Sequence, residues 1–91
     1  SENKTPLNIT RKSKPFYTDE ARKAGEKGDV RIAVMFGADG KTKYLLLLKG
    51  LRYGLNEQAL AAASQLEFEP EKIDGKPVSV VKTVVFTFDI Y

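Results

Sequence analysis

The chain has 91 residues, 42% of them hydrophobic and 30% charged, which fits one small globular domain. It contains neither cysteine nor histidine. Disulfides, thiolate metal sites and the commonest general base are therefore excluded. The longest apolar runs, such as Ile32–Phe36, have five residues, whereas a membrane-spanning helix needs about 20.

The formal net charge of +3 is confined to the first 15 residues. Four of the 15 basic residues and one of the 12 acidic residues lie there, which leaves 11 of each in residues 16–91. A polar, basic leader before a balanced body predicts a basic linker over residues 1–15 and one domain over residues 16–91. Within the linker, Leu7–Thr10 is a candidate for a short extra strand.

The first half of the body predicts a short helix followed by a hairpin. Thr18 is a suitable N-cap because acidic residues follow it in the first turn. Alternating apolar residues predict a strand over Val30–Phe36. The Asp39-Gly40 pair is typical of a tight hairpin turn, which leads into a return strand over Thr42–Leu48.

The second half predicts another helix and a long final strand. Asn56 is expected to cap a helix over residues 56–66, and Pro70 prevents its continuation. From Val78 to Tyr91, β-branched and aromatic residues alternate without glycine or proline. We expect this strand to be longer than those it pairs with, so that its edge exposes unpaired backbone groups.

The predicted fold class is α+β, with two helices packed on one face of a small antiparallel sheet of about three strands. The order of elements is helix, hairpin, helix and long final strand.

An apolar patch is expected on the helix-free face of this sheet, because the return strand is apolar on both faces. Such patches usually mark contacts. We expect Leu7–Thr10 or a second copy of the chain to cover it, so a homodimer is possible; the alternative is a central strand that tolerates exposed leucines. The residues that form the patch are Ala33, Met35, Tyr44, Leu46, Leu48, Val81 and Val85.

The sequence does not favour an enzyme. Asp39 and Asp74 each precede a glycine in a turn, where an aspartate side chain usually accepts a hydrogen bond from the backbone. Glu67, Glu69 and Glu71 alternate beside Pro70 and are expected to be solvated rather than paired, and the sequence has no phosphate-binding loop. We therefore predict no catalytic residue, no metal site and no cofactor.

A nucleic-acid partner is not favoured either. RNA-binding sheets present aromatic side chains on their central strands. The outward positions of the first strand are Arg31, Ala33 and Met35, none of which is aromatic, and the body carries no net charge.

Six short motifs, in unbroken order over roughly residues 14–91, resemble the C-terminal domain of the TonB energy-transducer family. No single motif is specific, but their order covers almost the whole chain. They are Phe16-Tyr17-Thr18-Asp19-Glu20-Ala21-Arg22, Gly28, Ala38-Asp39-Gly40, Tyr53-Gly54-Leu55-Asn56-Glu57-Gln58-Ala59-Leu60, Phe68-Glu69-Pro70 and Asp74-Gly75-Lys76-Pro77-Val78.

The resemblance implies a periplasmic domain that is tethered to the inner membrane by a segment absent from this chain. Such domains bind the N-terminal box peptide of outer-membrane transporters, which adds a strand to the sheet edge, and they transmit force from inner-membrane motor proteins. By the resemblance, the partner-binding residues are Lys14, Pro15, Phe16, Tyr17, Lys82, Thr83, Val84, Val85, Phe86, Thr87, Phe88 and Asp89.

The chain departs from the family pattern at two places. The family often has Tyr-Pro where this chain has Tyr17-Thr18, and an aromatic residue where Leu66 stands. These departures keep a second function open, in which a TonB-like peptide-recognition module belongs to another membrane-anchored protein such as a sensor or a protease.

Overall fold

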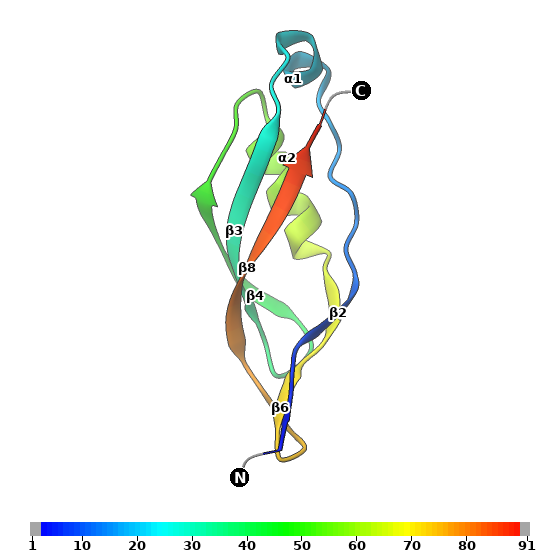
Figure 1. Cartoon of the computed structure of the whole chain (residues 1–91), viewed down its shortest axis with the longest axis vertical. Helices are drawn as coiled ribbons and strands as arrows, with labels where there is room; N and C mark the ends of the chain where they lie inside the picture. The colour runs from blue at the N-terminus through cyan, green and yellow to red at the C-terminus, as the bar shows by residue number, and fades with distance from the viewer. Residues whose placement is uncertain (1–2, 90–91) are drawn as a thin grey trace.

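The computed structural model describes residues 3–89 and shows an elongated molecule of 52 × 22 × 20 Å. Strands run along most of its length, and the two helices lie in its upper half (Figure 1). The strands are β1 (Lys4–Thr5), β2 (Asn8–Arg11), β3 (Gly28–Phe36), β4 (Thr42–Lys49), β5 (Glu67–Glu69), β6 (Glu71–Ile73), β7 (Lys76–Val78) and β8 (Val80–Phe88). The helices are α1 (Asp19–Ala24) and α2 (Leu55–Ser64).

The predicted fold class is wrong. Instead of two helices on one sheet of about three strands, the described residues form eight strands in three sheets, with two short helices. The difference comes from strands of two to four residues before α1 and after α2, which pair with each other. Segments this short carry too few alternating positions for a period to be read.

The largest sheet has the order β4-β3-β8. β8 pairs antiparallel with β3 in continuous register, from Gly28↔Phe88 to Phe36↔Val80. Both strands have nine residues, so the prediction that the final strand exceeds its partners is wrong with respect to β3. Ser79 alone separates β7 from β8, and the last two residues of the predicted strand lie outside the described residues.

The hydrophobic core lies between this sheet and α2. Even-numbered residues of β3 and β8 face it, apart from the exposed Lys82, because side chains alternate along a strand. α2 contributes alanines, which allow the helix to approach the sheet closely, whereas α1 lies beyond the upper end of β3 (Figure 1). The buried core residues are Ala21, Val30, Ile32, Val34, Phe36, Leu55, Ala59, Ala62, Ala63, Leu66, Phe68, Val84, Phe86 and Phe88.

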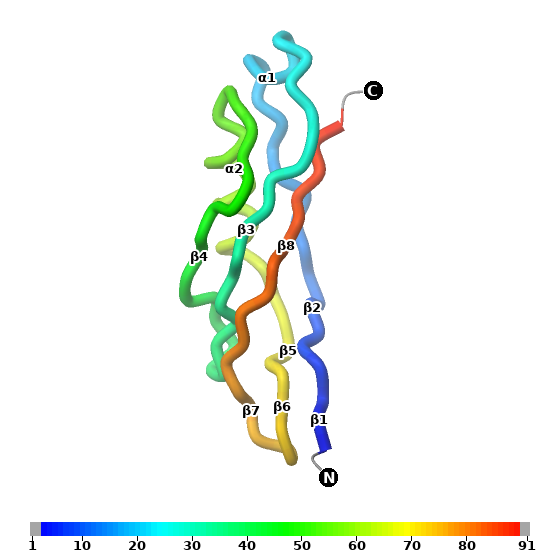
Figure 2. Tube along the Cα trace, turned by 60° about the vertical axis from the view of Figure 1, so that its left-hand side comes forward, coloured from blue at the N-terminus to red at the C-terminus, as the bar shows by residue number. Residues whose placement is uncertain are grey.

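Two small ladders hold the N-terminal residues on the lower half of the molecule (Figure 2). β1 pairs with β6, which also pairs with β7, and β2 pairs with β5. The extra strand expected near Leu7–Thr10 is confirmed as β2. Ion pairs join Lys4 to Glu71 at 3.5 Å and Arg11 to Glu67 at 3.6 Å across these ladders.

The helix boundaries confirm one predicted cap and correct another. The Thr18 hydroxyl accepts a hydrogen bond from the Ala21 backbone N–H at 3.2 Å, as an N-cap does. Asn56 lies inside α2, and Gly54 is the N-cap. The Asn56 side chain instead accepts from the Leu51 N–H at 2.8 Å, so it fixes the preceding loop rather than the helix end.

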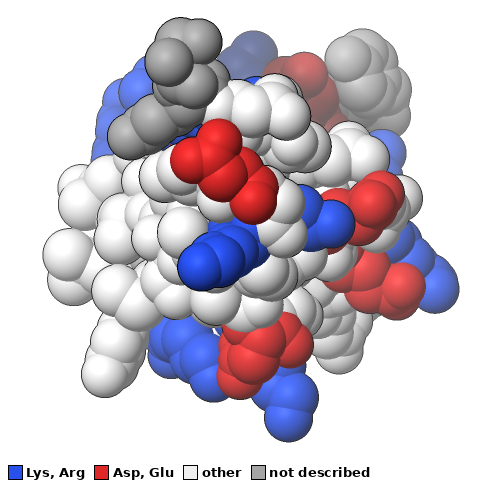
Figure 3. All heavy atoms as spheres, turned by 90° about the horizontal axis from the view of Figure 1, so that it is seen from below, with Lys and Arg blue, Asp and Glu red and all other residues white. Residues whose placement is uncertain are grey.

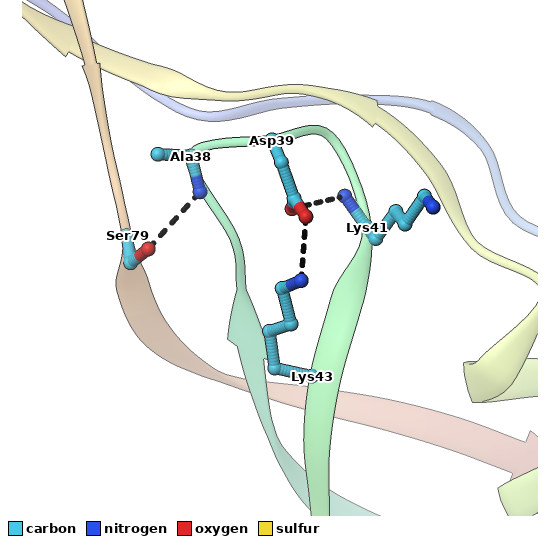
Figure 4. A network of polar contacts seen from close by, with 5 residues as sticks. All are labelled: Ala38, Asp39, Lys41, Lys43 and Ser79. Atoms are coloured by element: carbon cyan, nitrogen blue, oxygen red, sulfur yellow. Dashed lines mark hydrogen bonds and ion pairs between the residues drawn. The ribbon is translucent and has the colours of Figure 1, made fainter.

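The predicted hairpin turn is confirmed between β3 and β4 (Figure 4). The Asp39 carboxylate accepts from the Lys41 N–H at 3.2 Å and pairs with the Lys43 ammonium at 2.5 Å. The hydrogen bond from Lys43 lowers the pKa of the Asp39 carboxyl below its ordinary value. The Ala38 N–H donates to the Ser79 hydroxyl at 3.0 Å, which ties this turn to the break before β8.

Candidate functional site

The candidate site begins at the edge of β8. Within residues 3–89, β3 is the strand neighbour of β8 on one side, and no strand pairs with its other side. β4 is the opposite edge of the same sheet. The segment between β2 and α1 rises past β8 on the side away from β3 (Figure 1).

The hairpin shows which backbone groups of β8 face this open edge. Gly37 N–H donates to the Lys41 carbonyl at 2.8 Å, so odd-numbered residues of β3 bond towards β4 and even-numbered ones towards β8. The irregularity near this turn places its extra residue on β4, which leaves the alternation along β3 intact. Because the register pairs Ile32 with Val84, even-numbered residues of β8 bond to β3. The backbone groups that face outward are those of Thr83, Val85 and Thr87.

Side-chain burial follows the same alternation. The side chains of Val84, Phe86 and Phe88 are buried in the core. Their backbone groups bond to β3, so a visiting strand cannot reach them. Of the residues that the resemblance assigns to the final strand, a paired partner would therefore meet chiefly Thr83, Val85 and Thr87.

The structure brings the two predicted contact segments together. Lys14–Tyr17 and Thr87–Asp89, with Arg22, line a groove of about 540 Å³ at the end of β8. The Tyr17 ring packs edge-on against Phe88, with centroids 5.5 Å apart and an interplanar angle of 83°. This contact fixes the distance between the two walls of the groove.

Phe16 is the most exposed apolar side chain of the groove, with 66% of its surface accessible. It also lines a smaller hollow of about 220 Å³ between Ser13–Phe16 and α2. An exposed aromatic ring between two hollows is suited to anchor an apolar side chain of a partner.

Two residues near the groove were missed by the sequence reasoning. Arg22 lies in the groove wall, with its guanidinium 5.1 Å from the Tyr17 ring centroid. Lys12 Nζ donates to the Val85 carbonyl at 2.6 Å. In the sequence these residues are only basic positions in a leader and a short helix, and their roles depend on tertiary contacts that no local pattern reveals.

The apolar patch expected on the helix-free face is confirmed for four of its seven residues, whereas Ala33, Met35 and Val85 are half-buried. Tyr44, Leu46, Leu48 and Val81 are 71%, 62%, 52% and 58% exposed. Seen along the long axis, uncharged side chains gather on the left of the molecule (Figure 3), although β4 itself carries the exposed Lys43 and Lys49. Leu7–Thr10 does not cover this face, because β2 pairs with β5 instead.

No group of acidic residues in the described chain is arranged to hold a metal ion. Neither of its two helices has the length and apolar character needed to cross a membrane.

Comparison with known families assigns residues 13–90 to the family described as Gram-negative bacterial TonB protein C-terminal. The chain belongs to the TonB C-terminal family. Among solved structures, it resembles the TonB C-terminal domain of Pseudomonas aeruginosa, determined in solution by NMR, with a TM-score of 0.73 and 24% sequence identity. The likeness covers 92% of this chain and 86% of that one, and at this identity it shows a shared fold. A search among curated proteins found no match.

The family assignment confirms the resemblance deduced from the motifs. TonB C-terminal domains act in the periplasm of Gram-negative bacteria, and they are interaction domains rather than enzymes. In this TonB domain, the open edge of β8 and the groove at its end form one continuous candidate site, because Thr87 belongs to both.

The Tyr17 hydroxyl donates to the Glu26 carbonyl, which holds one groove wall against the end of α1. We expect Tyr17→Phe to lower the free energy of unfolding by about 1 kcal/mol, because this hydrogen bond is lost while the ring contact with Phe88 remains. Urea denaturation measures the change. Tyr44→Phe is the matched control, since Tyr44 is 71% exposed. An equal effect of both substitutions would show that the Tyr17 hydroxyl does not secure the groove.

Proposed function

We propose that this domain binds the N-terminal box peptide of an outer-membrane transporter by strand addition and transmits force for active uptake. The peptide pairs with the outward backbone groups of β8, and its end enters the groove beside Phe16. In this proposal the domain lies in the periplasm and is tethered to the inner membrane by a segment outside this chain, through which inner-membrane motor proteins act.

The observation that carries the proposal is the one-sided pairing of β8 within the described residues. Backbone hydrogen bonds to Thr83, Val85 and Thr87 require little sequence from the partner, and the groove adds selectivity. Each bond contributes about 0.5–1.5 kcal/mol net, so a few bonds give modest, reversible affinity.

The elongated shape suits the transmission of force. β8 runs obliquely up the upper part of the molecule (Figure 1). A load pulled along an added strand is shared by its bonds to β8 rather than opening them one at a time. At the N-terminal end, where the proposed tether would pull, the β1–β6 and β2–β5 ladders connect the N-terminal residues to the rest of the domain.

The second candidate function uses the same edge in another machine. A TonB-like module of a membrane-anchored sensor or protease would also recognise an extended peptide by strand addition. The two departures from the family pattern, at Thr18 and Leu66, leave this possibility open. The number of membrane helices in the full-length gene product separates the two: one helix with a spacer supports the transducer, and several support the alternative.

Titration of the labelled domain with synthetic transporter box peptides tests the proposed edge. We expect backbone-amide shifts to concentrate at Thr83–Asp89 and at Lys14–Tyr17. We also expect Phe16→Ala to weaken binding about tenfold, because an exposed anchor is lost while the core is unchanged. The matched control is Tyr53→Ala, an exposed aromatic in the loop before α2.

Shifts that follow Tyr44–Leu48 instead would place the partner on the β4 edge. That outcome would contradict the proposed docking edge while leaving strand addition possible.

With Leu7–Thr10 paired to β5, a second copy of the chain is the remaining predicted cover for the apolar face. We expect sedimentation equilibrium to show reversible dimers in the micromolar to millimolar range, and Leu46→Gln to weaken them because it places an amide in the contact. Leu46 is 62% exposed, so the substitution should leave the fold intact. A monomer at all accessible concentrations would contradict the predicted homodimer.

A further inference from the structure

Lys12 occupies the open edge of β8. Its ammonium donates to the Val85 carbonyl at 2.6 Å and lies 4.9 Å from the centroid of the buried Phe86 ring. This contact joins two segments that are 73 residues apart in the sequence. Val85 is the middle one of the three residues whose backbone groups face outward.

The position of Lys12 is set by its neighbours. It follows β2 directly, and β2 is held against β5 by backbone pairing and by the ion pair of Arg11 with Glu67 at 3.6 Å. The following residues, Lys14–Tyr17, form one wall of the groove. The Lys12 side chain is therefore held at the middle of the β8 edge, because the residues before and after Lys12 are both fixed in the structure.

A peptide strand that pairs with β8 would have to occupy the position of the Lys12 ammonium. A backbone N–H must approach the Val85 oxygen to about 2.9 Å from the open side. The ammonium already lies within hydrogen-bonding distance of that oxygen, and it also lies over the Phe86 ring, 4.9 Å from its centroid. Charged side chains, lysine above all, are a known way to protect an exposed edge strand from unwanted pairing.

We propose that Lys12 is a guard of the docking edge: it closes the middle of β8 in the free domain and is displaced when a peptide strand adds. This inference rests on the proposed function, since it assumes that β8 is the docking edge. The guard sets how tightly a strand binds, because each binding event must first break the contact between Lys12 and Val85.

The alternative is that Lys12 acts only in the fold, with its stem covering Phe86. Lys12→Met separates the two, because methionine keeps an unbranched apolar stem over the ring and removes the donor. Lys12→Arg keeps a charged donor at the same place. Lys76→Met, on the exposed strand β7, removes the same charge far from the edge.

The experiment measures the affinity of the wild-type domain and the three variants for one synthetic transporter box peptide, with capped ends and no charged side chains. Circular dichroism verifies that each variant is folded. We expect Lys12→Met to bind about three- to tenfold more tightly, in keeping with the loss of one exposed charge-assisted hydrogen bond. Lys12→Arg and Lys76→Met should remain within about twofold of the wild type. In the free Lys12→Met domain, the carbonyl carbon signal of Val85 should also shift.

Equal or weaker binding by Lys12→Met, with clear binding by the wild type, would overturn the guard and leave the proposed function intact. Tighter binding by Lys76→Met as well would assign the effect to overall charge and would also overturn it. Absence of binding by every protein would refute the proposed function and the guard together.

Discussion

The antiparallel pairing of β3 with β8 is the interaction on which the other features of this domain depend. Its register, from Gly28↔Phe88 to Phe36↔Val80, directs the apolar even-numbered side chains of both strands into one core under α2. The same alternation leaves the odd-numbered backbone groups of β8 facing away from the sheet. A shift of one residue would bury Thr83, Val85 and Thr87 and expose the phenylalanines, so the core and the proposed docking edge are specified together.

The N-terminal segment completes the site rather than merely preceding it. β1 and β2 fix it to the body, Lys12 lies on the edge of β8, and Lys14–Tyr17 form a groove wall. Under the proposed function, force that enters through this segment would pass through the β1–β6 and β2–β5 ladders to reach the rest of the domain. Under the two proposals, the segment that carries the load would also control access to the edge.

Strong local signals in the sequence predicted the elements of the main sheet, but not the architecture around it. Alternation over Val30–Phe36, the Asp39-Gly40 turn and the Thr18 cap each arise from residues close in the chain, and each is observed. The ladders of β1, β2, β5, β6 and β7 consist of two to four residues, and only long-range pairing makes them strands. For the same reason, the motifs suggested Lys14–Tyr17 and the final strand as site residues, whereas the contact of Lys12 with Val85 had no local signal.

Amide hydrogen exchange of the free and peptide-bound domain tests the central claim most directly, because it reports on the backbone donors themselves. The account predicts fast exchange at Thr83, Val85 and Thr87 in the free domain, slow exchange at Val84 and Phe86, and protection of the first three when a box peptide binds. If Thr83, Val85 and Thr87 are already as protected as Val84 and Phe86 in the free domain, or stay unprotected at saturating peptide, the vacant edge does not exist or is not the place where the peptide docks.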